Sequence, residues 1–303
     1  MNISDELKST LVAIHREKGK QWIHELSHLM ERIEKKYAIT FTTTPSFKLS
    51  YNYVVPAVTS EGKKVVVKMS VPNIELEREA EWLKDNQSEQ VVKMLDYDQK
   101  EGYLLLEQLY PGVSLSHIND DTKAVDIAAT LMKSIRKEPR AGHSYSSIGD
   151  WVKGLERIRE NFHGKTVSIN CELVDLAEER FHYLLSTMEQ SVLLHGDLHQ
   201  DNILLSHTGW KMIDPKGVIG EREVEVIPFL RNNLWKHERP KSVLENRVNH
   251  FCHLLGLHRE RILLWGFSLS ILSAWWLIED GQSQESVEQT LLLAQLFNDL
   301  LNS

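Results

Sequence analysis

The order of apolar and polar positions changes along the chain and divides it into segments of different secondary structure. Through residues 5–36 apolar side chains return every three or four positions, which is the period of amphipathic helices. Two runs rich in β-branched residues follow at 50–58 and 63–69, joined by the turn signal TSEG. A helix is expected over 72–86, and two further strand-like runs flank a polar turn within 91–109.

The pattern changes again at the sequence YPG, residues 110–112. Most of the remaining chain is typical of helices, apart from a strand-like segment at 192–213. We therefore expect an α+β protein with a small sheet-containing lobe, a short hinge and a larger helical lobe. The expected divisions are an N-terminal helical extension at 1–36, the small lobe at 37–109 and the large lobe at 110–303.

One uncharged stretch, residues 262–278, is at the short limit for a membrane span. It contains three serines and a glycine and lies between charged segments, so we interpret it as a buried helix and expect no membrane partner. A net charge of -8 with no basic stripe argues against a nucleic-acid partner. Two widely separated cysteines and the lack of a secretion signal favour a reducing, cytoplasmic location.

The densest group of titratable side chains is HGDLHQDN, residues 195–202, which lies between two apolar runs. The second run turns back after a few residues, and a hairpin there would bring Asp214 next to Asn202. An amide oxygen and a carboxylate suit Mg²⁺, which prefers hard oxygen ligands. Asp197 would then orient an acceptor hydroxyl and accept its proton, as the catalytic-loop aspartate of a kinase does.

A kinase site also needs a lysine on a strand for the phosphates and a glutamate on the following helix to hold that lysine. The strand-like run VVVKM supplies Lys68. Apolar residues of the next helix recur at i, i+4 and i+7, and Glu79 lies on the face that they define. A carboxylate on an apolar face needs a partner, so Lys68 and Glu79 are expected to pair. The other glutamates of this helix point to the side or outward: Glu75, Glu77 and Glu81.

Together these motifs resemble the aminoglycoside phosphotransferases. The sequences LLHGDLHQDNIL and IDPKGVIGE carry the resemblance to the wider superfamily. The segments LLLEQLYPGVSL at 104–115 and LSAWWLIEDG at 272–281 are similar to the branch of streptomycin 6-phosphotransferases and hydroxyurea-type resistance kinases. The resemblance extends from around Ser46 to Gly281 and implies a protein-kinase-like bilobal fold with a small antiparallel sheet lobe. It also implies ATP and Mg²⁺ as cofactors, and transfer of the γ-phosphate to a hydroxyl of a small, streptomycin-type acceptor.

Two features depart from the kinase pattern. Glycine at position 196 replaces the arginine that follows the catalytic-loop histidine of protein kinases. The flap expected over the phosphates, residues 46–55, has no glycine, so nucleotide cradling there is assigned to Ser50 and Asn52. In kinase-like folds the main chain of the hinge binds adenine, and by position the hinge residues are Glu107, Gln108 and Leu109.

Candidates for the acceptor site lie in the second half of the chain. Adjacent tryptophans cannot share one helix face, so at most one of Trp275 and Trp276 lines the site, and Trp276 is the candidate. Glu279 and Asp280 either bind ammonium groups of the acceptor or simply end this helix. They belong to a wider pool of carboxylates for a cationic acceptor, which also contains Glu221, Glu223, Glu225 and Glu238.

Other functions stay open on the sequence alone. The same fold would serve a kinase of a different small metabolite, because acceptor recognition lies in the variable helical part. A nucleotide-binding kinase homologue without catalysis is favoured only by the flap without glycine. The spacing H-x-D-x-H at 195–199 could hold a transition metal, as in a metallohydrolase, but no second histidine cluster accompanies it. Both a monomer and a homodimer are compatible with the sequence.

Overall fold

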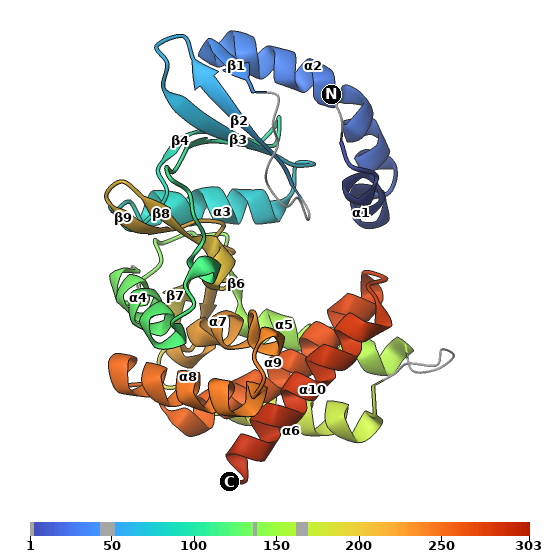
Figure 1. Cartoon of the computed structure of the whole chain (residues 1–303). Coiled ribbons are helices and arrows are strands. Elements are labelled where there is room, and N and C mark those ends of the chain that lie inside the picture. Colours follow the sequence, from blue (N-terminus) through green and yellow to red (C-terminus); the bar gives the residue numbers. More distant parts are fainter. Residues whose placement is uncertain (1–2, 43–51, 136–137, 162–168) are drawn as a thin grey trace. The chain divides into compact units, whose positions relative to one another are not determined.

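The computed structural model describes residues 3–42, 52–135, 138–161 and 169–303. The chain divides into two compact units, which follow one another from blue to red in Figure 1. The first contains Met1–Gly112 together with Leu205–Lys211, and the second contains Val113–Leu204 together with Met212–Ser303. A short segment from the second half of the chain therefore belongs to the first unit.

The first unit is built on a five-stranded antiparallel sheet with the strand order β1-β2-β3-β5-β4. Lys68 of β3 pairs with Val54 on one side and with Leu104 on the other. β3 is thus an interior strand, and its pairing with β2 and β5 fixes the position of Lys68 along the strand. The strands are β1 (Ile39–Phe41), β2 (Tyr53–Thr59), β3 (Lys64–Met69), β4 (Met94–Asp98) and β5 (Tyr103–Glu107).

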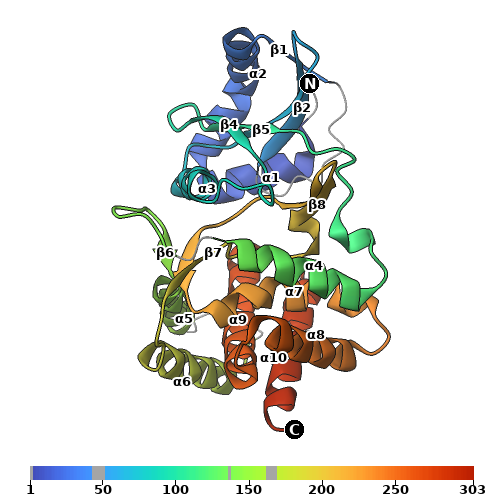
Figure 2. The same cartoon turned by 90° about the vertical axis from the view of Figure 1, so that its left-hand side faces the viewer.

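Helices α1 (Asp5–His15) and α2 (Glu17–Tyr37) pack on this sheet (Figures 1 and 2). Their apolar residues, Leu26 among them, share one buried cluster with alternate residues of β2 and β3, such as Val67. Because side chains alternate across a strand, Lys68 points to the opposite face of the sheet from Val67. The two N-terminal helices therefore contribute to the core of the first unit and leave the face of Lys68 uncovered by them.

The second unit is mainly helical (Figure 2). Its α-helices are α4 (Asp121–Ser134), α5 (Ile148–Asn161), α6 (Cys171–Ser186), α7 (Ile227–Arg231), α8 (Pro240–Leu255), α9 (Arg259–Glu279) and α10 (Gln284–Leu301). A three-stranded sheet has the order β6-β10-β7, with β6 (Ser146–Ser147), β7 (Val192–Leu194) and β10 (Val218–Gly220). A separate hairpin is formed by β8 (Ile203–Ser206) and β9 (Gly209–Met212), and most of it, Leu205–Lys211, belongs to the first unit. Short 3₁₀ helices are η1 (Leu115–His117), η2 (Gln200–Asn202), η3 (Arg222–Val226) and η4 (Leu234–Lys236).

Helix α9 contains the uncharged stretch of the sequence. By length and composition it is the one helix among the described residues that could cross a membrane, yet 72% of its most apolar window is buried inside the protein. It lies against α10, where a side chain at Gly266 would meet the ring of Phe297 at 2.4 Å. The prediction of a buried helix is therefore confirmed, and α9 is the core element of the second unit.

Candidate active site

The loop between β7 and η2 carries the charged motif, and His195 at its start is fully buried. Its imidazole Nε2 donates a hydrogen bond to the carbonyl of Ile213 at 3.0 Å, and Nδ1 accepts one from the N–H of Asp197 at 3.3 Å. Burial lowers the pKa of His195 to about 4, so the ring is neutral at physiological pH. Both ring nitrogens are engaged, so His195 acts as a brace and is not available as a metal ligand.

The backbone of His195 ties further segments to the same loop. Its carbonyl oxygen accepts hydrogen bonds from the N–H groups of Lys216 at 2.9 Å and Gly217 at 3.2 Å. Its own N–H donates to Oε2 of Glu225 at 2.8 Å. The loop that carries Asp197 and the segment that follows Asp214 are therefore held together by one buried residue.

Gly196 explains the departure from the protein-kinase pattern. Its φ is +80°, a conformation that residues with a side chain rarely adopt. A Cβ at this position would lie 2.8 Å from Cγ2 of Val218 in the neighbouring strand β10. An arginine would meet the same obstacle, so this loop requires glycine.

Asn202 and Asp214 are brought together by the β8–β9 hairpin that the sequence predicts. The N–H of Ile213 donates to the carbonyl of Asn202 at 3.0 Å, and Asp214 is the next residue along the chain. The side-chain Nδ2 of Asn202 donates to the carbonyl of Asp197 at 2.9 Å, which turns Oδ1 away from that carbonyl. Asp214 has a φ of +61° and an exposed side chain. The side-chain oxygens of Asn202 and Asp214 thus lie next to the loop that carries Asp197.

The carboxylate of Asp197 is mostly buried and lies among positive charges. Nζ of Lys216 is 3.2 Å from Oδ2, and Nη2 of Arg231 is 3.7 Å from Oδ1. Burial acts to raise the pKa of Asp197, but the charge of Lys216, followed by those of His199 and Arg231, outweighs it. The pKa therefore lies below its ordinary value, and the side chain is ionised near neutral pH.

In the first unit, Nζ of Lys68 lies 2.6 Å from Oε2 of Glu79, and each side chain is 7% exposed. Glu79 is carried by α3 (Ile74–Asp85), whose start is capped by the side chain of Asn73, which accepts from the N–H of Leu76 at 2.9 Å. Glu79 is buried with the apolar face of α3, whereas Glu75 is exposed. The expected pairing of Lys68 with Glu79 is present in the structure.

Comparison with known proteins agrees with this arrangement. A family model described as "Aminoglycoside/hydroxyurea antibiotic resistance kinase" matches residues 43–281. The chain belongs to this family. A streptomycin 6-kinase of Streptomyces glaucescens is 25% identical over 298 residues, which are 93% of each chain. A hydroxyurea phosphotransferase of Kitasatospora aureofaciens is 28% identical over 239 residues, which are 76% of this chain and 66% of that protein.

Solved structures show the same fold at lower identity. Choline kinase LicA of Streptococcus pneumoniae has a TM-score of 0.65 at 14% identity, covering 90% of this chain and 99% of that one. Aminoglycoside phosphotransferase APH(4)-Ia has a TM-score of 0.63 at 13% identity, covering 91% and 98%. The protein-kinase-like fold and the resemblance drawn from the motifs are confirmed.

The sequence also assigned a nucleotide-binding role to residues of the flap and of the hinge. Ser50 lies outside the described residues, and Asn52 is half-buried just before β2. Glu107 accepts from Nζ of Lys211 at 2.6 Å, a pairing that no sequence signal indicates. The N–H groups of Glu107 and Gln108 donate to backbone carbonyls, at 2.9 Å and 3.3 Å, whereas Leu109 follows the end of β5.

A pocket in the second unit of the kinase opens beside Asp197. Trp276 of α9 and Trp151 of α5 both line it, and their rings meet edge to face at 5.6 Å. Trp275, by contrast, is buried in the core. Glu279 and Asp280 lie at the end of α9 and do not line this pocket. Its other lining residues are Gly196, Lys216, Val224, Ile227, Pro228, Arg231, Leu269 and Ser273.

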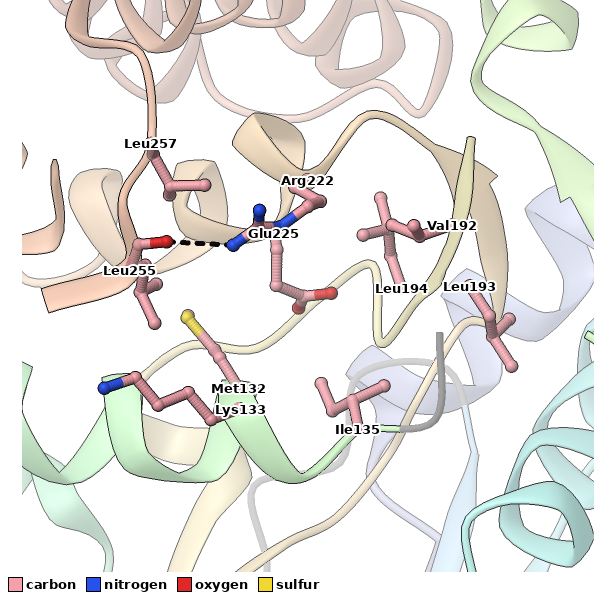
Figure 3. Close-up of a pocket in the computed structure, with 10 residues that line it drawn as sticks. All are labelled: Met132, Lys133, Ile135, Val192, Leu193, Leu194, Arg222, Glu225, Leu255 and Leu257. Carbon is pink, nitrogen blue, oxygen red and sulfur yellow. Dashed lines mark hydrogen bonds between the residues drawn. The ribbon is translucent and has the colours of Figure 1, made fainter. Parts of the chain in front are cut away.

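A second cavity lies between β7 and η3, and the Glu225 side chain points into it (Figure 3). Burial raises the pKa of Glu225 to about 8, although the N–H groups of His195 and Gly196 oppose this shift. Arg222, which also lines the cavity, donates from Nη2 to the carbonyl of Leu255 at 2.8 Å, the dashed line in Figure 3. Glu225 is thus a support of the loop rather than a ligand for a cationic acceptor.

The neighbouring glutamates are engaged in the same way. Glu221 accepts from Nε of Arg261 at 2.7 Å and from Nε1 of Trp265 at 2.5 Å. Glu223 accepts from the N–H of His258 at 3.1 Å. The expectation that this acidic run supplies carboxylates to an acceptor is therefore wrong, because the three side chains are buried and brace the fold.

Proposed function

We propose that this kinase transfers the γ-phosphate of ATP to a hydroxyl group of a small, streptomycin-type acceptor. The observation that supports it best is a set of hydrogen bonds that ties Asp197 and the segment around Asp214 to His195, and Asn202 to Asp197. Relatives named streptomycin 6-kinase align with 93% of the chain, which supports the acceptor class.

We assign to Asp197 the role of orienting the acceptor hydroxyl and accepting its proton. Its carboxylate is ionised and fixed by the loop, so it would accept a hydrogen bond from the hydroxyl and take the proton as the new O–P bond forms. In a loose transition state this proton moves late, so orientation matters more than basicity. A lowered pKa is therefore compatible with the role.

The residues that would hold Mg²⁺ are Asn202 and Asp214. One amide oxygen and one carboxylate suit this ion, and Oδ1 of Asn202 is turned away from the carbonyl that holds Nδ2. Bound Mg²⁺ would neutralise phosphate charge and align the γ-phosphate of the donor. Phosphate oxygens of the donor and water molecules would complete the coordination, since Mg²⁺ in such sites usually keeps several waters.

The donor nucleotide would be held mainly by the first unit. Lys68, fixed by Glu79, would contact the phosphates, with Ser50 and Asn52 on the flap. Adenine would bind the main chain of Glu107, Gln108 and Leu109. Since the N–H groups of Glu107 and Gln108 already have carbonyl partners, we assign the base chiefly to Leu109.

The acceptor would enter the pocket of Trp276. Glu279 and Asp280, at the C-terminal end of the same helix, would bind its cationic substituents. A second candidate acceptor is a small neutral one, such as the hydroxyurea on which a relative acts by name. The lining of the pocket favours it, because Lys216 and Arg231 are cationic and none of the lining residues is acidic. If the protein is instead a kinase of a different small metabolite, that metabolite would bind in this same pocket.

The test is acceptor-dependent ADP release by the purified protein with ATP and Mg²⁺. Streptomycin, hydroxyurea and choline would be compared, in the wild type, in Asp197→Asn and in the surface control Asp299→Asn. Turnover with streptomycin that Asp197→Asn abolishes and Asp299→Asn retains would support the proposal. Nucleotide binding without turnover on any acceptor would favour a non-catalytic kinase homologue, and turnover with hydroxyurea alone would favour the second candidate.

We also propose a cytoplasmic location and a monomer or homodimer. Both cysteines are free, Cys171 exposed and Cys252 half-buried, as is common for proteins of reducing compartments. Size-exclusion chromatography with light scattering would decide the oligomeric state.

A further inference from the structure

Two cationic side chains from different elements flank the carboxylate of Asp197. Lys216 lies in the segment before β10 and faces Oδ2, whereas Arg231, the last residue of α7, faces Oδ1. The backbone of Lys216 is anchored to the catalytic loop through the bond from its N–H to the carbonyl of His195. Each carboxylate oxygen thus has its own cation.

Neither cation is buried, although Nη1 of Arg231 also donates a hydrogen bond to Oγ of Ser273 at 3.2 Å. The side chain of Lys216 is 57% exposed and that of Arg231 is 40% exposed, and ion pairs of such exposed groups contribute little to stability. Arg247 of the same unit shows the opposite case. Its side chain is 2% exposed, binds Asp121 and donates to the carbonyl of Leu230 at 3.0 Å. Lys216 and Arg231 are therefore able to exchange partners.

Both cations line the pocket of Trp276 together with Gly196. We propose that Lys216 and Arg231 are catalytic residues that leave Asp197 and bind the oxygens of the phosphoryl group during transfer. This assignment rests on the proposed function.

The chemistry of transfer supplies the reason for the exchange. The acceptor oxygen forms a bond to the γ-phosphorus while the bond from that phosphorus to the bridging oxygen of ADP breaks. The hydroxyl proton passes late to Asp197, so this carboxylate keeps its charge until transfer is under way. In the transition state negative charge spreads over the phosphoryl oxygens and the leaving oxygen of ADP, and this charge draws Lys216 and Arg231 away from Asp197. Cations already waiting in the pocket stabilise that charge without reorganisation of solvent.

The test uses Lys216→Gln and Arg231→Gln, which remove charge and keep hydrogen-bonding capacity, with Lys216→Arg as the conservative variant. Turnover would be measured with streptomycin, and calorimetry would measure binding of ADP–Mg²⁺ with and without tetrafluoroaluminate, a mimic of the transferring group. We expect each Gln variant to lower kcat by about 10²-fold, as loss of one charge-stabilising donor does elsewhere. Affinity for ADP–Mg²⁺ should be unchanged, and affinity for the tetrafluoroaluminate complex should fall by a similar factor. Lys216→Arg should recover most of both.

Lys241→Gln is the matched control, because Lys241 is an exposed lysine of the same unit, lies 3.8 Å from Asp299 and does not line the pocket of Trp276. A wild-type kcat in both Gln variants would overturn the proposal. So would a lower kcat with unchanged tetrafluoroaluminate affinity, which would mean that the cations only orient Asp197. A wild-type protein that fails to bind ADP–Mg²⁺ would overturn the proposed function itself, and this assignment with it.

Discussion

The side-chain amide of Asn202 donates a hydrogen bond to the backbone carbonyl of Asp197, with 2.9 Å between nitrogen and oxygen. The bond orients both residues, because it fixes the peptide that follows Asp197 and the direction of Oδ1 of Asn202. It is also partly buried, so water cannot readily replace either partner.

Replacement of Asn202 by Asp should therefore destabilise the protein. A carboxylate cannot donate, and one of its oxygens would face the carbonyl of Asp197. We expect a loss of about 1–3 kcal/mol in the free energy of unfolding, measured in urea, together with a loss of turnover. Asn302→Asp is the matched control, since Asn302 donates from Nδ2 to the carbonyl of Asn298 at 2.9 Å in an exposed setting. Equal effects of the two substitutions would contradict the argument.

Substitutions in the Lys68–Glu79 pair should affect stability and nucleotide binding differently. Lys68→Met leaves the Glu79 carboxylate buried beside an apolar group, which should cost about 3–5 kcal/mol of unfolding free energy. The double variant Lys68→Met/Glu79→Leu removes both charges and should recover most of that stability. Neither variant should bind ATP with wild-type affinity. Denaturant unfolding and calorimetry would measure the two properties.

An exposed pair of the same unit serves as the control for this result. Nζ of Lys63 lies 2.9 Å from Oε2 of Glu61, and both side chains are largely exposed. Lys63→Met should leave the unfolding midpoint and ATP affinity unchanged. If the double variant kept its nucleotide affinity, the assignment of Lys68 to the phosphates would be wrong.

Local patterns predicted those parts of the site that depend on spacing along the chain. Helical periodicity identified Glu79 among four glutamates because one face of α3 is buried. The hairpin pattern predicted that Asp214 returns to Asn202, because strand pairing fixes which residues lie opposite each other. The packing of α1 and α2 on the sheet could not be derived, since an apolar helix face does not say which surface covers it.

Contacts between segments that are distant in the sequence could not be predicted from local patterns. Nothing near Glu225 indicates that it holds the backbone of His195, thirty positions earlier, and acidic side chains in a run more often face solvent. The approach of Lys216 and Arg231 to Asp197 depends likewise on where α7 and β10 pack. Such pairings follow from tertiary structure, and the sequence offered Glu221, Glu223 and Glu225 only as members of a pool of carboxylates, without indicating which of them are buried.

Gly196 should tolerate no side chain, for two reasons that can be measured separately. Alanine there would adopt a positive φ, at a cost of about 1–2 kcal/mol, and would also press on Val218. Gly62 has the same φ of +80°, and a Cβ added there would meet nothing within 4 Å, so Gly62→Ala reports the cost of φ alone. We expect Gly196→Ala to be the more destabilising in urea and to lower turnover.

Val218→Ala on the background of Gly196→Ala should recover the part of the loss that is due to crowding. The double variant should then approach the cost seen for Gly62→Ala, after correction for Val218→Ala alone. If Gly196→Ala cost no more than Gly62→Ala, crowding against β10 would not be the reason for glycine in this loop.

Glu225 should give the folded protein a characteristic pH dependence. Its pKa is raised by burial from 4.5 to about 8, so the folded state retains a proton that the unfolded state has lost. The stabilising effect is complete below pH 4.5 and is lost as pH rises through 8. The buried His195, with a pKa of about 4 against 6.5, acts in the opposite direction, but only below pH 6.5.

Glu225 should therefore dominate the window from pH 6.5 to 8, because the lowered pKa values of His15 and His199 act in the same direction as that of His195 and chiefly below pH 6.5. A difference of one bound proton corresponds to about 1.4 kcal/mol per pH unit, so stability should fall by about 2 kcal/mol across this window. Glu225→Gln retains an acceptor for the N–H of His195 and should flatten the curve, as measured by urea unfolding at each pH. Glu223→Gln, which removes a neighbouring buried carboxylate bonded to the N–H of His258, is the matched control. If Glu223→Gln flattened the curve as well, or Glu225→Gln left it unchanged, the slope would not belong to Glu225.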